Sequence, residues 1–461
     1  MAGPKHSCGV VGMNATYNVV PSLQRALLVI QHRGQESAGM SVFNDPETVT
    51  VKNNGSVNTV LNETTLAGIK SFCGIGHVRY STQGSKAAIN AQPLSVGSTI
   101  GTLTIAHNGD ITNFRDLKED YMKQGWSFLT DSDSEMIAKI ISKYISQTED
   151  IVTAIREAMG ELDGAYSLAI MVNDRIFGVR DPYGFRPLCI GKTNGGYIIV
   201  SESAALLSLG AEFIRDVEPG EIVEICKDSI ISYPAKKKCP RAHCMFEWIY
   251  FARPDSVIDG KCVYEVRKNV GKILAREAPA DVDLVMPIPD SGRAHAIGFS
   301  IVSGVDYEEG FMKNRFVDRT FILPEQKARE NAVAMKMNPI RSTIEGKRIV
   351  IVDDSIVRGT TLKKLIKMLK DAGAKEVHVR IGCPPVIAPC YYGVDMKSRD
   401  QFIATTHTVE EIRKTIGATS LAYISLEGLV EAIGMPADDL CLACVNNLYP
   451  TRIEGEKYRF D

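Results

Sequence analysis

Two adjacent carboxylates and a hydroxyl-rich turn form the strongest chemical pattern in the chain. The stretch VIVDDSIVRGTT (350–361) places Asp353 and Asp354 at the end of an apolar run, before a Ser/Gly/Thr turn and a helical segment. In open α/β sheets, ligands bind outside the carboxyl ends of the strands, and amides at a helix start can hold phosphate. Paired carboxylates suit ribose hydroxyls or a nearby Mg²⁺. The pattern predicts a site for a phosphorylated sugar, although an isolated Asp-Asp pair is more often a solvated turn.

Cysteines are the second set of reactive side chains. The chain has 11 of them, an odd number that favours reduced thiols over a disulfide framework. Cys441 and Cys444 form a CxxC pair that can hold a metal, and Cys244 and Cys390 can complete a set of four thiolates. Spacing leaves Zn²⁺ and an iron–sulfur cluster equally open. Two rivals for the first two places are Cys239 and Cys383.

A third candidate lies near the start of the chain. Cys8 opens the apolar stretch CGVVG (8–12) behind the polar leader Met1–Ser7. That leader lacks the apolar core of a signal peptide. It is therefore either an inert tail or a segment whose removal matters.

Chain length, net charge and hydropathy limit the classes of protein to which this chain can belong. A chain of 461 residues is too long for one core and indicates two domains. Its formal net charge of −2 gives no field that would attract nucleic acid or an anionic membrane. No apolar run approaches the roughly 20 residues that span a bilayer. We expect a cytoplasmic protein with neither nucleic acid nor membrane as a partner.

The two halves of the chain follow different patterns. Over 8–235, short β-rich runs such as GTLTIAHNGDI (101–111) alternate with turns, and helices are expected over 21–31 and 134–144. This arrangement predicts stacked sheets covered by helices. The polar, basic stretch 232–244 is expected to connect the domains.

The second half reads as strand–loop–helix units over 245–430, followed by a C-terminal segment, 431–461, that carries the CxxC pair. The stretch 347–382 is a compact βαβ unit and predicts a parallel, open α/β sheet. Its helix should bury one face, formed by Leu362, Leu365, Ile366 and Leu369.

The segment 350–361 resembles the signature with which type I phosphoribosyltransferases bind phosphoribosyl pyrophosphate (PRPP), and PDSGR (289–293) resembles their pyrophosphate loop. The resemblance implies that Asp353 and Asp354 hold the ribose hydroxyls and, with Ser291, Mg²⁺. The implied PRPP contacts are Ser291, Gly292, Arg293, Asp353, Asp354, Ser355, Arg358, Gly359, Thr360 and Thr361. The polar stretch 313–341 resembles the loop that closes over PRPP, with Arg319, Lys327, Arg329 and Lys336 as candidate phosphate contacts.

The first half resembles the class II glutamine amidotransferases, which are N-terminal-nucleophile (Ntn) hydrolases with an α+β sandwich fold of αββα layers. Five stretches carry the resemblance in order: CGVVG (8–12), QHRGQESAG (31–39), GHVRYST (76–82), AHNGDI (106–111) and SDSE (132–135). In that family a cysteine attacks the glutamine carboxamide and its own free α-amine is the base. An α-amine has a reference pKa of about 7.7–8.0, which suits this role. The resemblance implies that Cys8 is the nucleophile and that Met1–Ser7 is a propeptide, because an amide at Cys8 could not accept the proton.

The remaining roles in this half also follow from the resemblance. Arg79 would bind the glutamine α-carboxylate, and Asp133 the α-ammonium group. The Asn108 side chain and the Gly109 amide would form the oxyanion hole. Three further side chains are expected to support the site without touching substrate: Arg33, His77 and His107.

Together the two halves resemble the amidophosphoribosyltransferase family, across nearly the full length. That family uses ammonia from glutamine to displace pyrophosphate from PRPP, the first committed step of purine synthesis. It implies a homotetramer, feedback by purine nucleotides, and a sheltered ammonia route for which Tyr250 is a candidate wall. One branch combines a propeptide with a [4Fe–4S] cluster, and its pattern implies four ligands: Cys244, Cys390, Cys441 and Cys444.

Two other functions would use parts of the same pattern. The first is a PRPP-binding regulatory protein without glutaminase activity, which the intact Cys8, Arg79, Asn108, Gly109 and Asp133 argue against. The second is a glutaminase with another acceptor, as in hexosamine or asparagine synthesis. The stretch 350–361 fits neither of those pathways.

Overall fold

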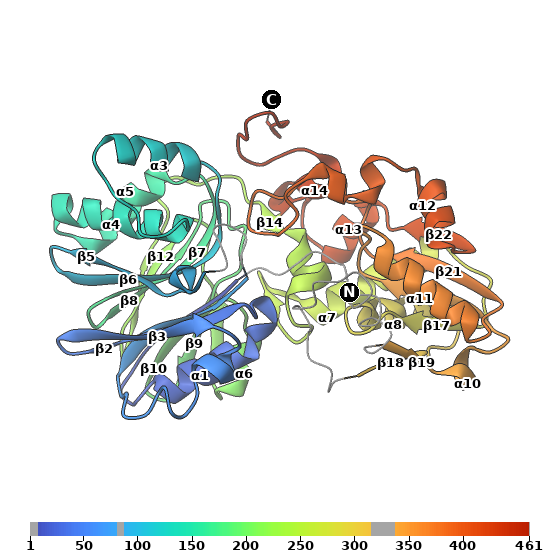
Figure 1. Cartoon of the computed structure of the whole chain (residues 1–461), viewed down its shortest axis with the longest axis horizontal. Coiled ribbons are helices and arrows are strands. Elements are labelled where there is room, and N and C mark those ends of the chain that lie inside the picture. The colour runs from blue at the N-terminus through green and yellow to red at the C-terminus, as the bar shows by residue number, and fades with distance from the viewer. Residues whose placement is uncertain (1–7, 81–86, 315–336, 461) are drawn as a thin grey trace.

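The protein is described by a computed structural model, in which residues 8–80, 87–314 and 337–460 are defined well enough to describe. The chain forms two lobes that meet along the middle of the molecule (Figure 1). The first lobe contains two antiparallel sheets, and the second contains a parallel sheet. Both sheet types match the sequence predictions.

The first lobe is a sandwich of two sheets. The seven-stranded sheet has the order β11-β9-β10-β1-β4-β2-β3, with strands β1 (Gly9–Ala15), β2 (Ser37–Asn44), β3 (Glu47–Asn54), β4 (Cys73–Arg79), β9 (Cys189–Thr193), β10 (Gly196–Val200) and β11 (Glu212–Asp216). The six-stranded sheet has the order β13-β12-β8-β7-β6-β5, with strands β5 (Leu94–Ser98), β6 (Gly101–Ile111), β7 (Gly164–Val172), β8 (Arg175–Arg180), β12 (Ile222–Ile225) and β13 (Ile230–Tyr233).

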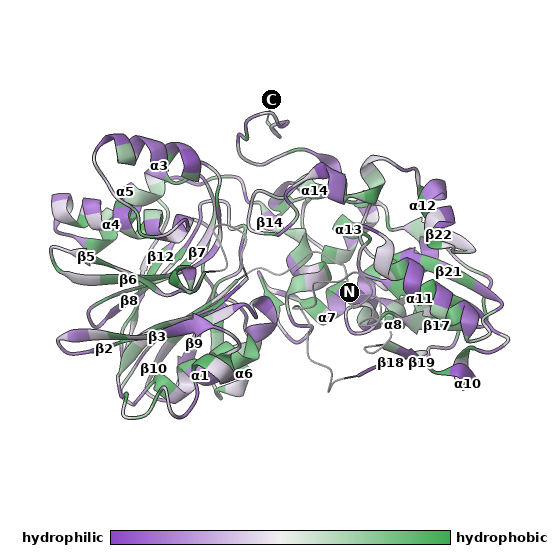
Figure 2. Ribbon diagram, viewed as in Figure 1, coloured by the Kyte–Doolittle hydropathy of each residue, from purple (hydrophilic) through white to green (hydrophobic). Residues whose placement is uncertain are grey.

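Helices cover both outer faces of this sandwich, which gives the expected αββα layers (Figure 1). Alternate residues of one strand enter different cores, because side chains of a strand point to opposite faces in turn. In β7, Leu168 packs under the helices and Ala169 packs between the sheets. The helices are α1 (Val20–Val29), α2 (Val57–Val60) and α6 (Ala204–Ser208) on one side, and α3 (Phe114–Lys123), α4 (Asp133–Thr148) and α5 (Ile151–Glu161) on the other. Figure 2 shows the same division, with apolar strands inside and polar residues along the outer side of α3.

The second lobe has a four-stranded parallel sheet in the order β17-β20-β21-β22. Its strands are β17 (Leu284–Pro287), β20 (Arg348–Asp353), β21 (Glu376–Ile381) and β22 (Ser420–Tyr423). Helices pack on both faces: α7 (Val263–Glu277) and α8 (Gly292–Ser303) on one, α11 (Thr360–Asp371) and α12 (Val409–Ile416) on the other. The predicted apolar face of α11 is confirmed, since its buried residues are Leu362, Leu365, Ile366 and Leu369.

Short elements complete the two lobes. Strand β14 (His243–Cys244) pairs in parallel with β23 (Leu440–Cys441), and α13 (Leu426–Ile433) packs on α7. The other short elements in the described residues are η1 (Gln31–Arg33), η2 (Ala88–Asn90), the π-helix η3 (Glu247–Phe251), β15 (Val257–Ile258), β16 (Lys261–Cys262), β18 (Phe311–Lys313), β19 (Met337–Pro339), α10 (Arg341–Ile344), η4 (Arg399–Gln401), η5 (Ile403–Thr405), η6 (Ala437–Asp439) and α14 (Ala443–Asn446). Among the described residues, no helix combines the length and apolar character needed to cross a bilayer.

Candidate active sites

Cys8 lies immediately before β1, a central strand of the seven-stranded sheet. Its Sγ lies 3.4 Å from the carbonyl oxygen of Tyr80, and Arg33 Nε donates to the Cys8 carbonyl at 2.9 Å. Burial raises the pKa of the Cys8 thiol to about 11. Near neutral pH the sulfur therefore keeps its proton and needs a base before it can attack.

Asn108 and Gly109 lie together on β6. Both polar atoms of the Asn108 side chain are buried and have no hydrogen-bond partner among the described residues. A buried amide without partners is costly, so it is expected where a ligand completes the bonding. Gly109 has φ +150°, and a Cβ there would lie 1.9 Å from the carbonyl oxygen of Ala165. Only glycine lets β6 approach β7 this closely.

Asp133 is the first residue of α4, and its carboxylate accepts a hydrogen bond from the amide of Ile111 at 3.1 Å. Burial alone would raise its pKa, but His107 at 3.7 Å and that amide keep the pKa of Asp133 below its ordinary value. An ionised carboxylate suits an α-ammonium group. Arg79 ends β4 and is buried. A Cβ at Gly34 would lie 2.6 Å from the Arg79 backbone, so the glycine of the RG pair permits that approach.

Two histidines lie beneath these residues. His77 Nε2 donates to the carbonyl oxygen of His107 at 2.9 Å, and burial lowers the pKa of His77 to about 3. For His107 burial opposes protonation, yet the Asp133 carboxylate raises its pKa above the ordinary value. Both contact protein groups, in agreement with a supporting role.

The second site lies at the carboxyl end of β20. Asp354 accepts hydrogen bonds from the hydroxyls of Ser291, at 2.5 Å, and Ser355, at 2.7 Å. A Cβ at Gly292 would lie 2.3 Å from the carbonyl oxygen of Val352, so this glycine lets the start of α8 pack directly against β20. The stretches 289–293 and 350–361 therefore meet at one place.

Acids and hydroxyls at this site suit Mg²⁺, which prefers oxygen ligands. Burial and the neighbouring Asp354 hold the pKa of Asp353 well above its ordinary value. A bound cation would favour the ionised pair, so Ser291, Asp353 and Asp354 fit the group. No three His, Cys, Asp or Glu side chains in the described ranges are arranged to hold a metal ion.

The other predicted PRPP contacts surround the same pocket. Its lining includes Tyr250, Ser355, Gly359 and Thr361. Gly359 has φ +71° directly before α11. The structure places Arg293 against Asp290 and Glu309, Arg358 against Gln401, and Thr360 at the start of α11. The loop residues Arg319, Lys327, Arg329 and Lys336 lie outside the described residues, as does Met1–Ser7.

The four predicted cluster ligands line one small apolar cavity. They are Cys244, Cys390, Cys441 and Cys444, and their neighbours there include Phe185, Phe246 and Tyr449. Pairing of β14 with β23 sets Cys244 opposite Cys441. Of the two rivals, Cys383 is buried and Cys239 is partly exposed, and neither lines this cavity. Four thiols around an apolar space fit an iron–sulfur cluster, whose several irons do not require the sulfurs to converge on one point.

Sequence reasoning missed a buried charged group between the lobes. Glu247 of η3 accepts hydrogen bonds from Arg33 and from Arg186, and Arg33 also contacts Glu202. No local spacing predicts these contacts, because they join residues far apart in the chain. The one available signal is a charged residue inside an apolar and aromatic run, as Glu247 is in MFEWIYF (245–251).

Comparisons with known proteins agree with both halves. Residues 77–208 match the glutamine amidotransferase domain family, and residues 265–383 match the phosphoribosyl transferase domain family. The amidophosphoribosyltransferase of Methanocaldococcus jannaschii is 50% identical over 98% of this chain and 99% of its own length. That of Archaeoglobus fulgidus is 48% identical over 98% of this chain and 99% of its own.

A solved structure extends this likeness to three dimensions. The glutamine phosphoribosylpyrophosphate amidotransferase of B. subtilis, complexed with ADP and GMP, matches with a TM-score of 0.91 and 41% identity, covering 98% of this chain and 99% of that one. Both domain types, their order and nearly the whole length are thus shared. The chain belongs to the amidophosphoribosyltransferase family.

Proposed function

We propose that the protein releases ammonia from glutamine at Cys8 and uses it to displace pyrophosphate from C1 of PRPP, giving 5-phosphoribosylamine, pyrophosphate and glutamate. This is the first step of de novo purine synthesis. One observation carries the proposal: a single helix, η3, serves both sites. Its Glu247 contacts the arginine that supports Cys8, and its Tyr250 lines the pocket of Asp353 and Asp354.

In the first half-reaction the Cys8 α-amine takes the thiol proton as the sulfur attacks the carboxamide carbon. Asn108 and the Gly109 amide stabilise the negative charge on the carbonyl oxygen, and Arg79 and Asp133 hold the ends of glutamine. The proton then passes to the leaving nitrogen, which departs as ammonia. Water cleaves the thioester to give glutamate.

In the second half-reaction the nitrogen lone pair of ammonia forms a bond to C1 of PRPP while the C1–O bond to pyrophosphate breaks. The resulting C1-bound ammonium group then loses one proton to water, which leaves the amine. Asp353 and Asp354 orient the ribose, and the turn 355–361 holds the 5′-phosphate. Mg²⁺, when bound by Ser291, Asp353 and Asp354, would supply positive charge for the leaving pyrophosphate. Ammonia protonated in bulk water has no lone pair, so we propose that it travels along η3 past Tyr250.

The base requires a free amine, so we further propose that Met1–Ser7 is a propeptide, removed by cleavage of the Ser7–Cys8 bond. The intact mass and N-terminal sequence of active protein test this. A fully active preparation that begins ahead of Cys8 would refute the role of the amine.

We assign a [4Fe–4S] cluster to Cys244, Cys390, Cys441 and Cys444. When bound it would supply a structural link, since neither half-reaction transfers electrons. Replacement of Cys444 by serine should abolish bound iron and sulfide in anaerobically purified protein. The matched control Cys239→Ser should keep both. Zinc in place of iron in the wild type would refute the assignment.

Regulation and assembly are inferred from the family. The related B. subtilis enzyme was solved with ADP and GMP, so we propose that purine nucleotides inhibit this protein as well. We propose a homotetramer, to be tested by its mass in solution. Its 11 cysteines, all free, support a reducing, cytoplasmic location.

The decisive experiment incubates processed protein with glutamine, PRPP and Mg²⁺ and measures glutamate, pyrophosphate and 5-phosphoribosylamine. All three should form in equal amounts. PRPP binding without glutamate release would favour the regulatory alternative. Glutamate release without pyrophosphate would indicate a different acceptor.

A further inference from the structure

Glu247 is the centre of a buried group of charges between the lobes. Arg33 donates to both of its oxygens, at 2.7 and 3.0 Å, and Arg186 donates to one of them at 3.1 Å. All three residues are at most 1% exposed. Glu202 supplies the second negative charge by accepting from Arg33 at 2.5 Å. Two cations thus face two carboxylates, as buried charges require.

Each arginine connects Glu247 to a different part of the glutaminase centre. Arg33 Nε donates to the carbonyl oxygen of Cys8 at 2.9 Å. Arg186 donates to the carbonyl oxygen of Tyr392 through Nε, at 2.9 Å, and Nη2, at 2.6 Å. The next residue, Gly393, packs on the oxyanion strand, because a Cβ there would lie 3.0 Å from Cα of Gly109. One carboxylate therefore supports both the nucleophile and the backbone of the oxyanion hole.

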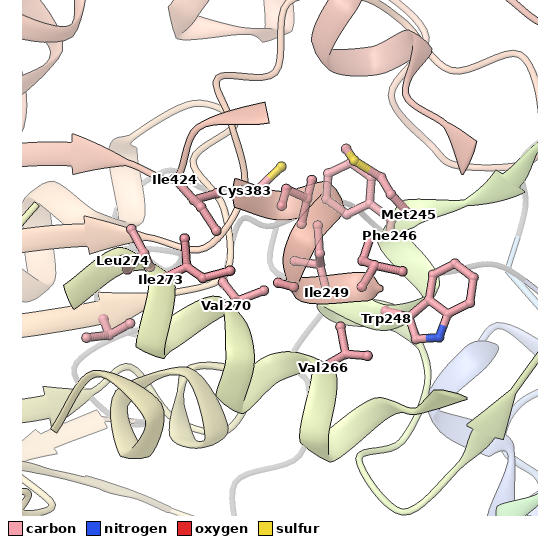
Figure 3. Packing of buried hydrophobic residues seen from close by; sticks show 14 of the residues in the cluster. Met245, Phe246, Trp248, Ile249, Val266, Val270, Ile273, Leu274, Cys383 and Ile424 are labelled. Carbon is pink, nitrogen blue, oxygen red and sulfur yellow. The ribbon is translucent and has the colours of Figure 1, made fainter. Parts of the chain in front are cut away.

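The position of Glu247 is set by the second lobe. Trp248 and Ile249 of η3 pack with Val266 and Val270 of α7 in the core of that lobe (Figure 3). Arg267 of α7 donates to the carbonyl oxygen of Trp248 at 2.7 Å. Helix η3 also contains Tyr250, which lines the PRPP pocket. π-Helical turns of this kind often occur at functional sites.

Building on the proposed function, we infer that Glu247 is a positioning residue for glutamine hydrolysis: it holds Arg33 against the Cys8 backbone and Arg186 against the loop that packs on Gly109. It contacts no substrate. Its effect passes through the two arginines, so the glutaminase centre depends on a carboxylate that the phosphoribosyltransferase lobe anchors.

The test compares Glu247→Gln with the wild type in the processed full-length protein. An amide keeps the shape but lacks the charge that orients two guanidinium groups. We expect kcat for glutamine hydrolysis to fall by about 10- to 100-fold, the range for a small misplacement of reacting groups. The KM for glutamine should change little, because Arg79 and Asp133 are untouched. An electrophilic glutamine analogue should modify Cys8 correspondingly more slowly, and Glu247→Asp should restore part of the rate.

Two measurements separate positioning from simple loss of structure. Added ammonia bypasses glutamine, so synthesis from ammonia and PRPP should stay within about twofold of the wild type if only the glutaminase centre is disturbed. The matched control is Glu218→Gln, the same change of side chain at an exposed ion pair. Glu218 accepts a hydrogen bond at 3.2 Å from Arg241, which lies in the stretch between the domains, and it contacts neither Arg33 nor Arg186. This control should leave kcat for glutamine nearly unchanged.

The inference is overturned if Glu247→Gln hydrolyses glutamine at the wild-type rate, or if it loses ammonia-driven synthesis in equal proportion. Should Glu247→Gln fail to fold, Arg186→Lys takes its place, since it keeps the charge but cannot reproduce the fork to Tyr392. It must then lower the same kcat, or the inference is refuted. A wild type that releases no glutamate would instead refute the proposed function itself.

Discussion

The glutaminase centre and the PRPP site hold reactive groups in opposite ways. Around Cys8 the side chains are buried and mostly in contact with protein partners, whereas both polar atoms of the Asn108 amide lack a partner in the described structure. At the PRPP site two carboxylates lie next to each other at the carboxyl end of β20, an inner strand of its sheet, and the pKa of Asp353 is well above its ordinary value.

This difference follows from the charge of the ligands. Glutamine is compact and carries a balanced pair of charges, so a dry, rigid cavity can be built for it in advance. PRPP carries many negative charges, and its site needs cations that arrive with it. The first site should therefore be sensitive to geometry and the second to charge.

The largest expected effect is from Cys8→Ala, which removes the nucleophile. Glutamine-dependent synthesis should fall by about 10⁴-fold or more, while ammonia-dependent synthesis continues. Parallel assays with glutamine and with ammonia check this. Equal loss in both assays would mean that the two sites are not chemically separate.

Asn108→Ala should lower kcat for glutamine hydrolysis by about 10²- to 10³-fold, as expected for one lost oxyanion donor. Its buried amide has no other partner to lose within the described residues, so stability should change little. Steady-state kinetics and thermal unfolding of the same preparation measure both effects. A large fall in Tm with unchanged kcat would contradict the assignment.

Asp354→Asn tests the charge-dependent side of the comparison. It removes a charged acceptor that receives hydrogen bonds from Ser291 and Ser355. Each such bond contributes about 1.5–3 kcal/mol, so synthesis should fall by about 100-fold with either nitrogen source. Glutamine hydrolysis without PRPP should persist. If only the glutamine-dependent reaction were lost, the assignment of Asp354 to the PRPP site would be contradicted.

The smallest expected effect is a change in how the free energy of unfolding depends on pH, caused by His77 beneath the glutaminase centre. The pKa of His77 is lowered to about 3 by burial, whereas an unfolded histidine titrates near 6.5. Below about pH 6.5 this histidine is protonated in the unfolded chain but stays neutral in the folded chain. The free energy of unfolding therefore decreases as the pH falls. Between pH 7 and pH 5 the cost is about 2 kcal/mol. Urea denaturation of His77→Asn should therefore show about 2 kcal/mol less loss of unfolding free energy over that interval than the wild type. An identical loss in both proteins would show that His77 titrates normally in the folded state.

Much of the fold was predictable from local patterns. The β-rich run 101–111, the apolar face of 360–371 and the acidic strand end at 353–354 are all local signals, and each corresponds to an observed element. They work because side chains alternate along a strand and recur every three or four residues along a helix. The site residues themselves are predictions from motif resemblance. The structure brings Cys8, Asn108 and Asp133 into one lobe, and Ser291 and Asp354 into hydrogen-bond contact.

The amino-acid sequence by itself determined the two kinds of domain, because the motifs of each, including those with Cys8, Asn108 and the paired acids, lie in short contiguous stretches. Only the tertiary structure decided how the two are joined. The contacts of Glu247 with Arg33 and Arg186 span 214 and 61 residues. Contacts over such separations arise from how the lobes pack, and no local spacing encodes them.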